Sequence, residues 1–333
     1  MEDRKNDHIA LAFSSQVAEA RADHRFSYEP LLGSHIQGEI EPFTFLGRTL
    51  RLPIWVSSMT GGAVKARSIN TNLARACSEF GMGMGLGSCR VLLEDNSCFP
   101  DFDMRDVIGN DLPLYANIGI VQLEDMMKAK SYHRLLELVE RLRADGLIIH
   151  VNPIQEWLQA EGDVLKTPPV ETIEEFLTVS GMKVIVKEVG QGMGRESISR
   201  LMQLPIAALE LAAFGGTNFA SVELARSKPE KRDLYAPLAL LGHSTGEMLE
   251  VINELVYAGK PITCRQIIIS GGIRTFLDGY FYISKCALPS VYGQASGFLR
   301  YALGDYDELR QYIIGQVNGL KFARAFLKVK NEK

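Results

Sequence analysis

The chain has 333 residues, of which 46% are hydrophobic and 23% charged, and its formal net charge is -4. This composition excludes a disordered chain, and the acidic balance excludes a nucleic-acid surface, which needs a basic face to displace phosphate counterions. No run of about 18 apolar residues predicts a membrane span, and the first ten residues, MEDRKNDHIA, lack the apolar segment of a signal peptide. We therefore expect a cytoplasmic protein with no nucleic-acid or membrane partner. The five cysteines form no CxxC pair, which favours reduced thiols over a zinc site or disulfides.

Along the chain, the first fifty residues show no regular alternation and predict a partly helical N-terminal arm. From residue 53 onward, short apolar runs alternate with longer amphipathic stretches. The stretch 67–81 is typical of a helix, because Ile69, Leu73 and Phe80 follow helical spacing, and the stretch 132–146 has the same character. The predicted strands are 53–57, 82–87, 114–119, 147–152, 183–188, 207–212, 266–272 and 290–295.

This order of elements predicts the fold class. Nearly continuous apolar strands, each followed by a helix, are typical of a parallel sheet covered by helices. Eight such repeats predict a closed (β/α)8 barrel, the TIM barrel, with an open doubly wound sheet as the main alternative. We expect one domain over 1–333, with 1–50 as its arm and 218–262, a long polar stretch, as a lid or long insertion.

Polar residues stand at the ends of several predicted strands, where the loops of a barrel converge on its mouth. A lone histidine is more often a satisfied core residue, but four strand ends of this kind together favour a functional site. Gln155 and Glu156 follow one of these strands after Pro153, which ends it. The strand-end residues are Asn117, His150, Asn152, Lys187 and Arg274.

Glycine-rich segments at 81–88, 214–217, 270–273 and 293–297 let backbone N–H groups approach an anion. The segment SGGIRT, after the seventh strand, is the strongest candidate, because the loops after strands seven and eight commonly bind phosphate in such barrels. The segment GMGMGLG lacks the G-x-G-x-x-G spacing of a dinucleotide fold, so a Rossmann domain is excluded.

Taken together, these segments resemble the type 2, FMN-dependent isopentenyl-diphosphate isomerases over nearly the whole chain. The resemblance implies a (β/α)8 barrel, bound FMN, Mg²⁺, and NADPH or NADH to reduce the flavin. It also implies a homotetramer or higher homo-oligomer that converts isopentenyl diphosphate to dimethylallyl diphosphate in isoprenoid biosynthesis. The matching segments are RKNDHI (4–9), SSMTGG (57–62), GLGSCR (85–90), ANIG (116–119), HVNPIQE with EGD (150–163), VIVKEVGQGM (184–193), FGGT (214–217) and SGGIR (270–274).

The resemblance also implies roles for particular residues. Glu156 would bind Mg²⁺, with diphosphate oxygens and water as the other ligands. The implied catalytic residues are His150, Asn152, Gln155 and Lys187, and the implied substrate contacts are Arg4, Lys5, His8, Arg90 and Gln155. The implied FMN contacts are Ser58, Met59, Thr60, Ser88, Asn117, Lys187, Thr217, Gly272, Arg274, Ala295 and Ser296.

Elementary chemistry supports two of these assignments. The charge of Lys187 suits the negative edge of a reduced flavin. Arg4, Lys5 and His8 fall within one helical turn, which would let all three face a diphosphate.

Two other functions stay open at this point. An FMN-dependent oxidoreductase of 2-hydroxy acids would need a His–Arg pair near the barrel mouth, and no such pair appears late in the sequence. A flavin-binding relative without catalysis is the other alternative, because several positions depart from the family pattern. These are Phe214, His243, Ser244, Tyr292 and Gln294.

Overall fold

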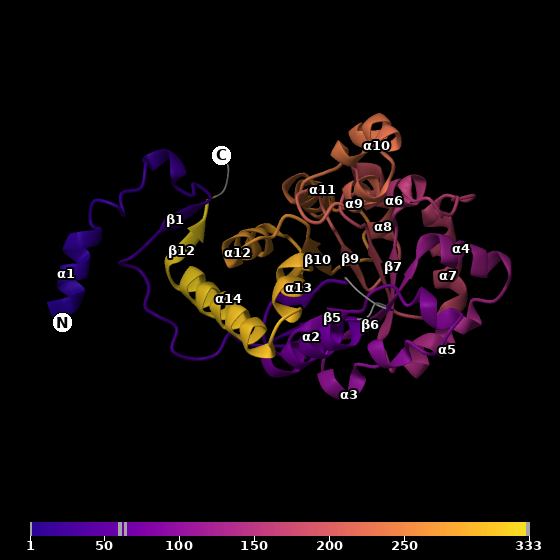
Figure 1. Cartoon of the computed structure of the whole chain (residues 1–333), viewed down its shortest axis with the longest axis horizontal. Coiled ribbons are helices and arrows are strands. Elements are labelled where there is room, and N and C mark those ends of the chain that lie inside the picture. Colours follow the sequence, from indigo (N-terminus) through magenta and orange to yellow (C-terminus); the bar gives the residue numbers. More distant parts are fainter. Residues whose placement is uncertain (1, 59–61, 63–64, 331–333) are drawn as a thin grey trace.

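The computed structural model describes residues 2–58, 62 and 65–330. In this part of the chain, eight parallel strands close into a barrel, and the open sheet is excluded (Figure 1). Each strand lies within two residues of its predicted bounds, so the prediction of a (β/α)8 barrel is confirmed. The strands are β4 (Ile54–Val56), β5 (Gly83–Gly85), β6 (Leu114–Gly119), β7 (Gly146–His150), β8 (Val184–Lys187), β9 (Ala208–Glu210), β10 (Ile267–Ser270) and β11 (Ser290–Gln294).

Helices surround the barrel and bury one face against it. In α2 (Ala66–Phe80), Ile69 and Leu73 are buried as their helical spacing predicts. Gly81 ends this helix in the left-handed conformation, φ 72°, and its N–H bonds the carbonyl of Cys77 at 2.8 Å. Later helices are α3 (Arg105–Ile108), α4 (Ile120–Lys128), α5 (His133–Arg141), α6 (Pro153–Leu158), α7 (Pro169–Ser180), α8 (Arg195–Gln203), α12 (Phe276–Lys285), α13 (Ser296–Ala302) and α14 (Tyr306–Phe326).

The amino end of the barrel is closed by a hairpin of β2 (Phe43–Phe45) and β3 (Arg48–Leu50). Phe45 and Leu50 are fully buried beneath the strands. The N–H of Leu46 donates to Gln266 Oε1 at 2.6 Å, just before β10 begins. This end of the barrel is therefore packed and hydrogen bonded rather than open.

A charged cluster holds the same end. Asp145, just before β7, accepts hydrogen bonds from Arg48 at 2.5 Å, Arg105 at 2.9 Å and the N–H of Leu114 at 3.0 Å. Burial alone would raise the pKa of Asp145, but these hydrogen bonds hold it below its ordinary value. The cluster therefore stabilises a carboxylate at the base of the barrel.

The N-terminal segment begins with α1 (Glu2–Leu11) and continues to β1 (Phe26–Tyr28). Strand β1 pairs antiparallel with β12 (Leu327–Val329), so residues 26–28 of the N-terminal segment lie beside the strand that follows the last helix. In Figure 1, α1 lies at one end of the molecule, beyond β1 and β12 and apart from the barrel.

The stretch 218–262 contains three α-helices and one 3-10 helix, η4 (Ala236–Leu240). The first two are α9 (Phe219–Arg226) and α10 (Pro229–Tyr235), and α9 packs on α6 through a small apolar cluster that includes Leu158 and Leu224. The third, α11 (Thr245–Tyr257), packs on α8 as a helix of the barrel layer. A lid role for this stretch stays a prediction. In the described ranges, no helix combines the length and apolar character needed to cross a membrane.

Candidate active site

Three neighbouring strands end in polar side chains at the same level of the barrel. His150 on β7 is the register partner of Lys187 on β8, and Lys187 is the register partner of Glu210 on β9. Partners in a parallel ladder project toward the same face of the sheet. The sequence therefore brings an imidazole, an ammonium and a carboxyl group together at the carboxyl end.

His150 is held in one orientation by Asn117. The Nδ2 group of Asn117 donates to the carbonyl of Leu86 at 3.0 Å, which leaves its Oδ1 to face Nδ1 of His150 at 2.8 Å. Nδ1 therefore carries the hydrogen and donates it to Asn117 Oδ1. Burial lowers the pKa of His150 to about 3, with the charge of Lys187 as a smaller cause. The imidazole is thus neutral, and its Nε2 offers a lone pair.

Glu156 lies in α6, which begins at Pro153 directly after the Asn152 cap. One carboxylate oxygen of Glu156 accepts from Asn152 Nδ2 at 3.0 Å, and the other accepts from the N–H of Asp163 at 3.0 Å. Asn152 Nδ2 also donates to Gln155 Oε1 at 3.2 Å. The Oδ1 atom of Asn152 is buried and has no hydrogen-bond partner among the described residues. Asn152, Gln155, Glu156 and Asp163 therefore form one hydrogen-bonded group. The Oδ1 atom of Asn152 is the acceptor in this group that is left for a ligand.

Arg90 is linked to this group through Asp163. The Oδ2 atom of Asp163 accepts from Arg90 at 3.3 Å and from Gln122 at 3.2 Å, while its N–H donates to Glu156. The Arg90 side chain is half exposed. The guanidinium of Arg90 has further N–H donors for an anionic ligand. The carboxylate groups beside it suit a cation that the same ligand binds.

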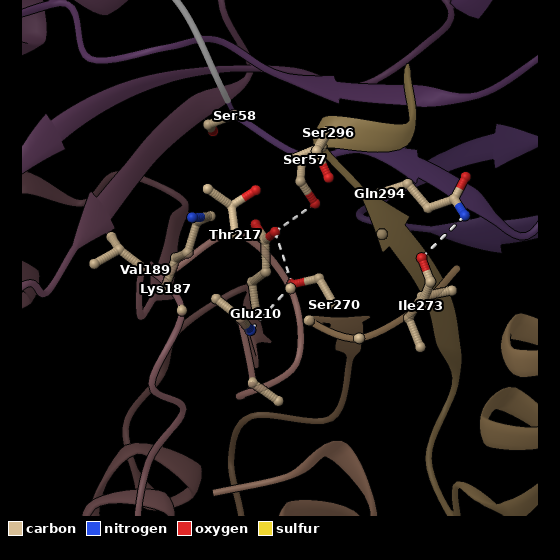
Figure 2. Close-up of a pocket in the computed structure, with 18 of the residues that line it drawn as sticks. Ser57, Ser58, Lys187, Val189, Glu210, Thr217, Ser270, Ile273, Gln294 and Ser296 are labelled. Atoms are coloured by element: carbon tan, nitrogen blue, oxygen red, sulfur yellow. Dashed lines mark hydrogen bonds between the residues drawn. The ribbon is translucent and has the colours of Figure 1, made fainter. Parts of the chain in front are cut away.

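A pocket opens at the same end of the barrel, and Figure 2 shows its lining. In this view Lys187 lies on one side, Ile273 and Gln294 lie on the other, and Glu210 lies between them. Gln294 Nε2 donates to the carbonyl of Ile273 at 3.2 Å, which ties the loop after β10 to the end of β11. The pocket therefore runs from the ammonium of Lys187 to two loops that follow β10 and β11.

Two glycine-rich loops line this pocket and lie against each other. Gly271 and Gly272 are left-handed, with φ of 93° and 72°, and a Cβ on Gly271 would lie 2.1 Å from the carbonyl oxygen of Ala213. A Cβ on Gly216 would lie 3.2 Å from the Cα of Gly271. The close approach requires glycine and leaves the backbone accessible to a phosphate.

The pocket also holds polar atoms that lack a partner in the described part of the chain. Ser58 Oγ and Glu210 Oε2 are both buried in this way, and both residues line the pocket. A buried polar group without a partner is unfavourable, so these atoms indicate a ligand with polar groups of its own. A flavin phosphate fits this lining, because it has hydrogen-bonding groups along its length and an anionic end.

No protein-family model matches the chain. A curated isopentenyl-diphosphate delta-isomerase of Synechococcus sp. is 36% identical over 327 residues, which are 96% of this chain and 90% of that protein. The enzyme of the same name from Rickettsia felis is 35% identical over 90% of this chain and 85% of its own length. The chain belongs to the isopentenyl-diphosphate delta-isomerase family. The recognition of a type 2 member from the sequence is confirmed.

Solved structures resemble this isomerase-family chain in fold. The flavin-binding domain of baker's yeast flavocytochrome b2 has a TM-score of 0.62 at 13% identity and covers 91% of this chain and 72% of that chain. A mandelate oxidase variant with a monooxide FMN adduct has a TM-score of 0.56 at 13% identity and covers 92% of this chain and 88% of that chain. At such low identity the likeness shows the barrel fold alone.

The structure brings most of the predicted site residues of this family member together. Asn117, His150, Asn152, Gln155, Glu156 and Arg90 form the hydrogen-bonded groups described above. The predicted FMN contacts that line the pocket are Ser58, Lys187, Thr217, Gly272, Ala295 and Ser296.

The remaining predicted residues do not line this pocket or are outside the described part of the chain. Ser88 and Arg274 are exposed and are not part of the pocket lining, and the N–H of Arg274 donates to Asp278 at 3.0 Å. Met59 and Thr60 lie outside the described residues. Arg4, Lys5 and His8 form one turn of α1, as their spacing predicts, but α1 lies apart from the barrel of its own chain (Figure 1).

Sequence reasoning missed Glu210, Ser57 and Ser270, which meet inside the pocket. Glu210 is the single charged residue of the apolar run AALELA, which was a usable signal of a functional strand. The hydroxyl groups that bind it come from other strands, and no local pattern reveals them.

Proposed function

We propose that the chain converts isopentenyl diphosphate to dimethylallyl diphosphate by moving a double bond between allylic positions. The observation that carries this proposal is the arrangement of polar groups at the barrel mouth of a member of this family: His150 is the register partner of Lys187, and Asn152, two residues after His150, donates a hydrogen bond to Glu156. We further propose that the pocket beside them binds FMN, which NADPH or NADH reduces before the first turnover.

When bound, reduced FMN would supply the proton donor and proton acceptor for the allylic shift. Lys187 would hold a positive charge next to the electron-rich ring. Gly272, Ala295 and Ser296 would bind the phosphate, because they line the part of the pocket where the backbone is accessible. Thr217 would add a hydroxyl group between these two ends.

The side chains around His150 would orient the substrate rather than act as strong acids. A neutral imidazole with its hydrogen on Nδ1 accepts a hydrogen bond or a proton at Nε2 and donates none there. Asn152 and Gln155 are fixed against each other and against Glu156, so they would keep the reacting carbons in register with the flavin.

We propose that Glu156 binds Mg²⁺ together with the substrate diphosphate. The described residues contain no cluster of three or more His, Cys, Asp or Glu side chains that would hold a metal by itself. A single carboxylate with diphosphate oxygens and water is a usual environment for Mg²⁺. The buried Oδ1 of Asn152 supports this, because a metal-bound water would give it a donor.

We also propose a homotetramer or a higher homo-oligomer. Arg4, Lys5 and His8 are substrate-binding candidates, yet α1 lies away from the barrel of its own chain. An arm that reaches a neighbouring subunit would bring these three side chains to a diphosphate. Leu31, on the same arm, is 93% exposed, which suits a surface that another copy covers.

A cytoplasmic location is part of the same proposal. The five cysteines are free thiols, which is usual in a reducing compartment.

The visible spectrum of the purified protein, combined with a product assay, tests the proposed function. Protein reconstituted with FMN and reduced in the presence of Mg²⁺ should convert isopentenyl diphosphate to dimethylallyl diphosphate. A colourless protein that does not bind added FMN, or a flavin-loaded protein that forms no product, would contradict the proposal.

A further inference from the structure

Glu210 is a buried carboxyl group whose two oxygens have different surroundings. Its side chain is fully buried at the end of β9. Oε1 accepts hydrogen bonds from the hydroxyl groups of Ser57 at 2.6 Å and Ser270 at 3.1 Å. Oε2 has no partner in the described ranges, although Glu210 lines the pocket. The described residues therefore hydrogen bond to Oε1 and leave Oε2 available to a ligand.

The two serines hold this carboxyl group in a fixed position. Ser270 Oγ also accepts the N–H of Ala212 at 3.0 Å, so its hydroxyl hydrogen is directed to Glu210. A Cβ on Gly293 would lie 2.5 Å from Ser57 Oγ and 2.9 Å from the Cβ of Ser270, so glycine makes room for the cluster. Rotation of the carboxyl group would lose both hydroxyl donors, which keeps Oε2 in place.

An oxygen in this position favours a ligand that donates a hydrogen bond. An unpaired acceptor in the interior is unfavourable, and a donor on the ligand would remove that penalty. Such donors are hydroxyl, N–H and ammonium groups. The position of Glu210 selects among them, because it lies between Lys187, where a flavin ring would bind, and the glycine loops, where a phosphate would bind (Figure 2).

We propose that Glu210, with Ser57 and Ser270, forms a subsite for one hydroxyl group of the ribityl chain that joins the flavin ring to its phosphate. Glu210 is thus a specificity residue for the polyol part of the cofactor. The subsite lets the pocket distinguish a flavin phosphate with an intact polyol from one that lacks this hydroxyl. This inference rests on the proposed binding of FMN.

The test measures the dissociation constants of FMN and of its 2′-, 3′- and 4′-deoxy analogues by quenching of flavin fluorescence. The unsubstituted protein should bind one analogue about 10- to 100-fold more weakly than FMN. In Glu210→Gln, which keeps an acceptor for both serines, the loss for that analogue should be at least about 5-fold smaller, because an amide nitrogen replaces the acceptor oxygen Oε2.

Riboflavin is the matched control ligand. It lacks the phosphate, which Glu210 does not contact, so its loss relative to FMN should be the same in both proteins. If Glu210→Gln does not fold, the affinities of the unsubstituted protein for FMN and the three analogues still test the subsite. Binding of all three analogues within about 3-fold of FMN would overturn the subsite, and so would an equal loss for the weakest analogue in both proteins. Failure to bind FMN at all would instead overturn the proposed function.

Discussion

The two ends of the barrel both bury charged groups, but they surround them differently. At the amino end, Asp145 accepts hydrogen bonds from Arg48, Arg105 and the N–H of Leu114. At the carboxyl end, Ser58 and Glu210 each keep a buried oxygen that has no partner in the described part of the chain. The difference indicates that polar groups at the amino end stabilise the fold, whereas those at the carboxyl end await a ligand.

Substitution of Asp145 should have the largest effect on folding. Asp145→Asn removes the charge that pairs Arg48 and the buried Arg105, so the free energy of unfolding should fall by about 4 kcal/mol. Urea unfolding measures this loss, and the FMN affinity of the remaining folded protein should not change. Asp106→Asn is the control, since Asp106 pairs with Arg143 on the surface and should matter little. If the two variants were equally stable, the hydrogen bonds of Asp145 at the amino end would not stabilise the fold.

Substitution of Glu156 should leave the fold intact and reduce catalysis. Glu156→Gln should lower kcat/KM roughly 150-fold, because it removes the carboxylate that would bind Mg²⁺. This corresponds to a loss of about 3 kcal/mol of transition-state stabilisation. FMN affinity should be unchanged. Glu161→Gln, on the exposed loop after α6, should retain full activity. Full activity of Glu156→Gln, or of the unsubstituted protein in EDTA, would refute the metal assignment.

Two adjacent serines sharpen the comparison further. Within the described residues Ser58 Oγ has no partner, so Ser58→Ala should raise the free energy of unfolding of the apoprotein by up to about 1 kcal/mol while weakening FMN binding. Ser57 donates to Glu210, so Ser57→Ala should instead destabilise the apoprotein. Thermal unfolding with and without FMN measures both effects. If Ser58→Ala destabilises the apoprotein as much as Ser57→Ala does, Ser58 is part of the fold and not of a ligand site.

A further expected effect is a pH dependence of stability that His150 causes. Its folded-state pKa, about 3, lies below the ordinary value of 6.5, so the unfolded chain binds a proton that the folded chain does not. Stability should therefore be flat above about pH 6.5 and should fall as the pH drops from about 6.5 toward 3. His150→Gln should reduce the slope of the unfolding midpoint between pH 7 and 5, whereas the exposed His133→Gln should keep it. Identical slopes in the two variants would contradict a neutral, enclosed His150.

The sequence predicts the barrel well because its signal is local. Each strand is a short apolar run, and all eight are found within two residues of their predicted bounds. The group of Asn152, Gln155 and Glu156 is equally local, since the N-cap and the first turn of one helix place these residues together. Patterns of this kind survive folding because few distant contacts can change them.

The parts that sequence reasoning did not predict depend on distant contacts. Glu210 meets Ser57 across 153 positions of the chain, which no spacing rule reveals. Arg274 follows a glycine pair that favours phosphate binding, but Asp278 caps α12 and takes its N–H. The helical spacing of Arg4 and His8 is real, yet the position of α1 relative to the barrel depends on how β1 pairs with β12.

Anaerobic turnover without nicotinamide tests the central claim most directly. A double-bond shift consumes no electrons, so a bound flavin needs to be reduced only once. Protein reduced with dithionite, with Mg²⁺ present, should form many molecules of dimethylallyl diphosphate per active site without NADPH or NADH, and the oxidised protein should be nearly inactive. Oxidation of one NADPH per product, or full activity with oxidised FMN, would contradict the account and favour an oxidoreductase.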